Sequence, residues 1–96
     1  MAYPLRGGDV LEAWLATTSE PPEVRRAVRD WVRHQLMEDP NNTEIRGTTA
    51  PSEDGPAVTW CFVDNADVVV SFQVIRKEPI GYVELVHIES VHDIEA

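Results

Sequence analysis

The chain has 96 residues, of which 43% are hydrophobic and 26% are charged, so an ordinary globular composition leaves room for a single domain over residues 1–96. Seventeen acidic residues against eight lysines and arginines give a net charge of −9, which opposes binding to the phosphates of nucleic acids. The single cysteine, Cys61, excludes an internal disulfide framework, and no stretch approaches the roughly 18 apolar residues of a membrane span, so we expect a cytoplasmic protein.

Residues 9–17 carry the first helical pattern. We expect Asp9 to cap this helix, because Glu12 follows three residues later, where a capping-box partner belongs. The apolar residues fall at helical spacing on one face, at Val10, Leu11, Trp14 and Leu15. A helix this short is not stable alone in water, so its apolar face must lie against other apolar residues.

Residues 22–38 carry the second and clearer helical pattern. Pro21 and Pro22 suit the start of a helix, where no hydrogen-bonded N–H is lost. Apolar residues recur at intervals of three and four, at Val24, Ala27, Val28, Trp31, Val32 and Leu36. Pro40 ends the pattern. Because the connection between the two helices is only a few residues long, we expect an antiparallel helical hairpin.

The second half of the chain changes to the two-residue period of β-strands. Residues 41–56 are polar and contain prolines and glycines, and we interpret them as a loop with at most a short extended piece at 44–46. Alternation of apolar and polar residues then predicts three strands, at 57–63, 68–76 and 82–90.

The alternation also assigns faces to the strands. Val58, Trp60 and Phe62 share one face of the first strand, and we expect this face to point toward the helices. Trp60 then joins Trp14 and Trp31 in one core cluster. The sequence therefore predicts an α+β fold, in which an antiparallel helical hairpin packs on an antiparallel sheet of three to four strands.

The order of these elements, together with three stretches of sequence, resembles the RelE/ParE superfamily of toxins from toxin–antitoxin pairs. LMEDPNN is similar to the end of the family's second helix, which a proline often closes. WCFVDNADVVVSFQV resembles the family's hairpin of strand, tight acidic turn and strand, and YVELVHIESVHDIEA resembles its last strand and tail. The resemblance covers most of the chain. The family usually opens with a strand as well, and residues 1–5 show no clear strand pattern.

The resemblance implies one of two activities. Ribonuclease members bind messenger RNA on the sheet with arginines and lysines, and a histidine near the end of the last strand acts in acid–base catalysis; His92 matches that position. The stretch around Val69 lacks the family's arginine, and residues 53–96 hold nine acidic residues against Arg76 and Lys77. Members similar to ParE bind a protein target instead. We therefore expect protein binding; an enzyme would be a ribosome-dependent mRNA endoribonuclease with His92 as its catalytic residue.

Arginines are concentrated on the second predicted helix, where Arg25, Arg26, Arg29 and Arg33 make up half of the lysines and arginines in the chain. Arg26, Arg29 and Arg33 lie opposite the apolar stripe, and we expect part of their charge to pair with Asp30. This basic stripe is either a solvated helix face or a docking site for an acidic segment of a partner protein.

Two functions from different classes stay open. The first is a toxin-family protein that binds its target and is neutralised by an antitoxin laid over its helices or sheet edge. The alternative is a non-toxic interaction module that kept the fold and lost the chemistry. Both predict a protein partner, no nucleic acid, no membrane and no cofactor, and a homo-oligomer stays open. We expect no metal site, because His87 and Glu89 share a strand face on which His92 does not lie.

Overall fold

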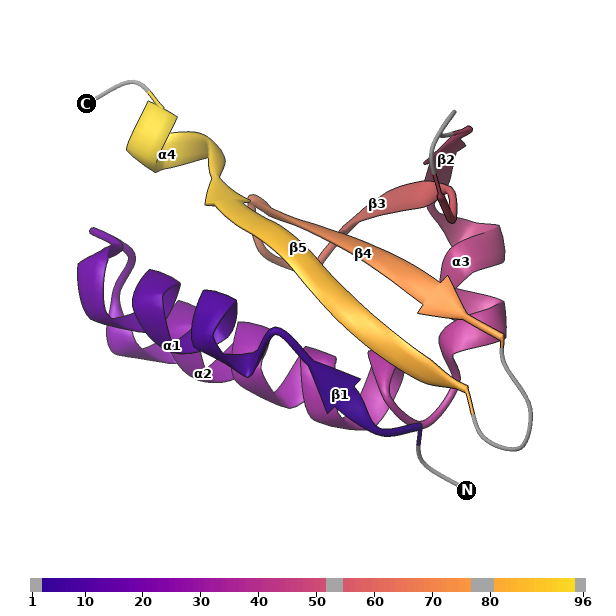
Figure 1. The fold of residues 1–96 in the computed structure, drawn as a ribbon. Coiled ribbons are helices and arrows are strands. Elements are labelled where there is room, and N and C mark those ends of the chain that lie inside the picture. The colour runs from indigo at the N-terminus through magenta and orange to yellow at the C-terminus, as the bar shows by residue number, and fades with distance from the viewer. Residues whose placement is uncertain (1–2, 52–54, 77–80, 95–96) are drawn as a thin grey trace.

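The computed structural model describes residues 3–51, 55–76 and 81–94 and has an α+β fold (Figure 1). Five strands form one mixed sheet in the order β1-β5-β4-β3-β2. The strands are β1 (Leu5–Arg6), β2 (Thr48–Ala50), β3 (Val58–Phe62), β4 (Val68–Ile75) and β5 (Tyr82–Ser90). The helices are α1 (Gly8–Thr17), α2 (Pro22–Trp31), α3 (Pro40–Arg46) and the short α4 (Val91–Ile94).

The two predicted helices are confirmed, and α1 and α2 run in opposite directions over one face of the sheet (Figure 1). The second helix continues beyond α2 as a π-helical turn, Val32–Leu36, in which the amide of Met37 donates to the carbonyl of Val32. The predicted cap of α1 by Asp9 is wrong. Gly7 occupies the N-cap position in a left-handed conformation, with φ 78°, so Asp9 lies within the first turn.

The prediction of a loop over residues 41–56 is wrong at its start. The helix α3 begins at Pro40, a residue suited to a first helical turn, and β2 follows it; no extended piece lies at 44–46. The side chain of Thr43 is buried, and its hydroxyl lies 2.8 Å from the carbonyl of Asp39 and 3.2 Å from that of Gln35. The helix α3 also packs against β3 and β4, and these contacts with the sheet stabilise a helix that its polar sequence does not indicate.

The sheet has more strands than predicted, and it is mixed rather than antiparallel. β1 precedes α1 and pairs in parallel with β5, Leu5 opposite Val83 and Arg6 opposite Glu84. The other strand pairs are antiparallel. Two residues are too few to produce a visible alternation, which is why the sequence pattern shows no strand there.

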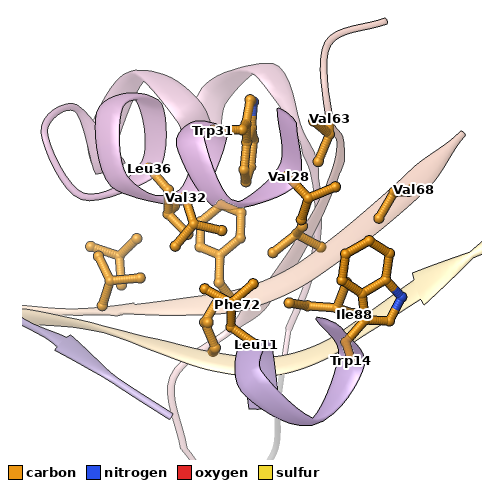
Figure 2. Packing of buried hydrophobic residues seen from close by; sticks show 14 residues of the cluster. Leu11, Trp14, Val28, Trp31, Val32, Leu36, Val63, Val68, Phe72 and Ile88 are labelled. Carbon is orange, nitrogen blue, oxygen red and sulfur yellow. The ribbon is translucent and has the colours of Figure 1, made fainter. Parts of the chain in front are cut away.

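The core lies between α1, α2 and the sheet face that they cover, and Figure 2 shows its packing. On β4 the alternate residues Val68, Val70, Phe72 and Val74 are all buried. Trp14 and Trp31 are also in the core, each 7% exposed.

The face predicted for β3 is wrong. Thr59 and Val63 are buried, whereas Trp60 is 40% exposed and Phe62 is 59% exposed. The register places Thr59 opposite the buried Phe72, and Thr59 exchanges a hydroxyl hydrogen bond of 2.8 Å with Thr49 of β2. Large residues alternate with equally apolar ones in this strand, so hydrophobicity alone does not decide which face is buried. Trp60 therefore lies outside the core cluster.

Candidate functional site

A groove of about 380 Å³ lies between the end of α1 and the first turns of α2. Leu15 and Pro22 provide apolar walls, and Arg25, Arg26 and Arg29 provide the rest of the lining. Residues three and four apart on a helix lie on one side of it, so Arg29 lies beside both Arg25 and Arg26. The helical hairpin thus places three guanidinium groups around one open groove.

The side chain of Arg25 links the two helices and has one N–H donor that makes no hydrogen bond within the described part of the chain. Its Nη1 atom lies 3.5 Å from the carbonyl oxygen of Leu15, near the C-terminal end of α1. Its Nε atom is buried and has no hydrogen-bond partner among the described residues. A buried donor without an acceptor costs free energy.

The charges of the groove are uncompensated. No described carboxylate lies within 4.0 Å of Arg25, Arg26 or Arg29, so the predicted pairing with Asp30 is wrong. Arg33 is exposed and lies one turn further on, in the π-helical segment, outside the lining of the groove. The structure therefore brings together Arg26 and Arg29 of the predicted stripe, adds Arg25 and leaves Arg33 apart.

His92, the predicted catalytic residue, lies in α4 between two carboxylates. Its Nδ1 atom is 2.7 Å from Oε1 of Glu20, and its Nε2 atom is 3.4 Å from Oδ2 of Asp67. The side chain of Glu20 is 5% exposed and comes from the connection between α1 and α2, whereas Asp67 comes from the turn between β3 and β4. The backbone reinforces this contact, because the amide of Val91 donates to the carbonyl of Asp67.

This geometry is that of a structural clasp. A general base needs a ring nitrogen directed at the reacting proton, but both ring nitrogens of His92 face carboxylates of the protein. The two ring nitrogens lie on opposite sides of the imidazole, so one side chain contacts both carboxylates. The clasp joins α4 to two connections that are far apart in the sequence.

Three further ion pairs lie apart from the groove and from His92. Arg76 lies 2.9 Å from Glu44, and Arg46 lies 3.5 Å from Asp64. His87 and Glu89 share a strand face as predicted, with Nε2 and Oε2 3.9 Å apart. No group of three or more potential metal ligands occurs within the described residues.

Sequence reasoning missed Glu20 and the lining role of Arg25. Glu20 lies 72 positions from His92, and no local pattern connects them. Arg25 lies nearer the apolar stripe than Arg26 does, so the periodicity left it out of the basic face. Its spacing of four from Arg29 is the one signal that indicated a shared side of the helix.

No protein-family profile matches the chain, and no curated protein or solved structure is significantly similar to it. Within the described residues, no helix combines the length and apolar character that crossing a bilayer requires.

Proposed function

We propose that this protein is a protein-binding domain whose arginine groove receives an acidic segment of its partner. The observation that carries the proposal is the uncompensated set of Arg25, Arg26 and Arg29 around one groove, in a chain with a net charge of −9. Because the chain has so few lysines and arginines, its composition alone does not lead us to expect three of them around one groove. Carboxylates are the natural ligands, since guanidinium groups bind them in two-point contacts.

We further propose that the domain belongs to a toxin–antitoxin pair of the RelE/ParE kind, with the antitoxin as the partner. The element order supports this proposal: a short strand, two antiparallel helices and an antiparallel meander of β3, β4 and β5. The strand β1 supports it too, because the family usually opens with a strand. Within this proposal the protein acts by binding a protein target.

The sheet does not favour RNA cleavage. Val69 stands between Phe62 and Glu89 in the register, where the family's ribonucleases carry an arginine nearby. Without a cation there, the charge that develops during phosphodiester cleavage has no stabilising partner.

Growth on induced expression tests the toxin proposal. We expect expression in a bacterial host to slow growth, and co-expression of the small gene adjacent to this one to restore it. Normal growth at high expression, together with no small adjacent gene, would favour the non-toxic interaction module.

Selection from a random peptide-display library on the immobilised protein tests the groove separately. We expect a class of acidic peptides that bind Arg29→Glu at least about tenfold more weakly than the unaltered protein. Arg33→Glu is the matched control, because it makes the same charge change on the same helix outside the groove. Equal weakening by the two variants would mean that only the overall charge matters, and the groove would not be the site.

A further inference from the structure

The sheet face that α1 and α2 do not cover carries two exposed aromatic rings. Trp60 and Phe62 are alternate residues of β3, so they lie on the same face, opposite to that of the buried Thr59. Trp60 is 40% exposed although it pairs with both β2 and β4, and Phe62, at the end of β3 beyond the pairing with β2, is 59% exposed. Clustered exposed aromatic residues commonly mark a binding surface.

The neighbours of the two rings make the aromatic surface accessible. Trp60 stands opposite Ser71 of β4, and Phe62 stands opposite Val69. Both neighbours are small, so they do not cover the flanks of the rings. A partner that lies on β4 can therefore contact the sides of the rings as well as their edges.

The next strand adds carboxylates to the same face. Ser71 stands opposite His87 of β5, and Val69 stands opposite Glu89, so two cross-strand rows each run from an aromatic through a small residue to an ionisable one. Glu84 lies further along β5 on this face, opposite Gln73. The side chain of Glu89 is 50% exposed. The face thus combines an apolar side on β3 with an acidic side on β5.

We propose that this open face binds a basic amphipathic segment of a partner protein. Apolar side chains of the segment pack on Trp60 and Phe62, and its lysines or arginines reach Glu84 and Glu89. Aromatic residues supply most of the binding free energy in protein interfaces, and complementary charge sets orientation and association rate. The net charge of −9 favours approach of a basic segment.

Two other occupants fit the face less well. Aromatic pairs on a sheet can stack nucleic-acid bases, but such surfaces also need cations for the phosphates. The cation on the described part of this face is Arg6. Its guanidinium already lies over a ring of the protein, 4.4 Å from the ring centre of Tyr82. A second copy of this chain would bring the same carboxylates of Glu84 and Glu89 into the interface, where they repel.

This surface is distinct from the arginine groove. The groove lies on the helices, which cover the other side of the sheet (Figure 1), and it has the opposite charge. The two proposals therefore stand or fall separately.

The same random peptide-display selection tests the open face. We expect a second class of peptides, rich in lysine or arginine and apolar residues, that bind Trp60→Ser at least about tenfold more weakly than the unaltered protein. Ile45→Ser is the matched control, because Ile45 is 80% exposed on α3 and its loss should leave binding unchanged. A selection without any peptide class that depends on Trp60 would overturn the proposal.

A charge variant makes the test independent of any effect of Trp60→Ser on folding. Glu89→Lys alters an exposed side chain, and we expect it to weaken the basic peptides and leave the acidic class bound at the groove. Glu38→Lys, at an exposed position beyond α2, should weaken neither class.

Two further measurements decide between occupants. Binding of an oligouridine RNA that disappears in Phe62→Ser would identify a nucleic-acid surface and overturn the proposal. A dimer in sedimentation experiments that disappears in Phe62→Ser would identify a second copy as the occupant, with the same consequence.

Discussion

The Nδ1 atom of His92 lies 2.7 Å from the buried Oε1 atom of Glu20, and this contact joins the last helix to the connection between the first two. Its position makes it a link between segments that otherwise share few contacts. The side chain of His92 is 59% exposed, whereas that of Glu20 is 5% exposed, so the carboxylate depends more on the contact than the imidazole does.

We predict that His92→Ala lowers the free energy of unfolding by about 1–2 kcal/mol, because it leaves the buried carboxylate of Glu20 without the ring nitrogen of His92 as its hydrogen-bond partner. Urea denaturation followed by circular dichroism measures the change. His87→Ala is the control: its pair with Glu89 is exposed and 3.9 Å long, and its loss should cost less than about 0.5 kcal/mol. Equal costs would mean that the clasp does not stabilise the fold.

We predict that the purified protein does not cleave ribosome-bound messenger RNA. Both ring nitrogens of His92 face carboxylates, and Val69, which stands between Phe62 and Glu89 in the register, carries no charge. Primer extension on messenger RNA from a translation reaction detects cleavage. Codon-specific cuts that vanish in a folded His92→Ala variant would contradict this prediction.

Gly7→Ala should destabilise the protein by about 2 kcal/mol or more. Gly7 has φ 78°, and a Cβ atom there would lie 2.6 Å from the carbonyl oxygen of Leu85, which is too close. The neighbouring Gly8→Ala is the matched control. Gly8 lies in the first turn of α1 with no atom within 4 Å of the added Cβ, so alanine should stabilise the helix by about 0.5–1 kcal/mol. Thermal unfolding of both variants checks the opposite signs.

Cys61 should react slowly with iodoacetamide in the folded protein. Burial raises the pKa of its thiol above the ordinary value of 9.0; Asp64 raises it further, and Arg46 lowers it. Less thiolate is therefore present at neutral pH, and the reaction rate should still rise beyond pH 9. Because the folded state favours the neutral thiol, this group's contribution to stability is lost as pH rises through its folded pKa.

Charge variants distinguish an effect of charge on the pKa of Cys61 from slow reaction that is caused by restricted access to the thiol. Arg46→Ala should raise the pKa of Cys61 and Asp64→Asn should lower it, as followed by the ultraviolet absorbance of the thiolate. A shift in the same direction for both variants would mean that the charges do not act on the thiol.

The parts of the fold that could be predicted are those with strong local periodicity. The apolar stripe through Val28 and Val32 determines one helix face, and the alternation from Val68 to Val74 determines one strand face. Exposed Arg29 and Asp30 follow Val28 in the helix, and Ser71 and Gln73 alternate with the buried residues of β4, so one arrangement buries most of the apolar set.

The errors occur where long-range contacts outweigh local patterns. The helix α3 depends on its packing against β3 and β4, and β1 depends on its pairing with β5. In β3 both faces are apolar enough for the core, and pairing in register with β4 decides that Thr59 is buried and Trp60 is exposed. The candidate site could be predicted only in part, for the same reason. Helical spacing places Arg26 and Arg29 on one side of the second helix, whereas no local pattern predicts the contact of Glu20 with His92.

The pairing of β1 with β5 bears on how the protein folds as it is made. The strand β1 is synthesised before every other strand of the sheet, but its partner β5 follows β2, β3 and β4. Until β4 and β5 emerge, Leu11 and Trp14 of α1 have no sheet to cover them. The nascent chain therefore presents its apolar helix face to chaperones and proteases until β5 has been synthesised, and the sheet cannot be completed before then.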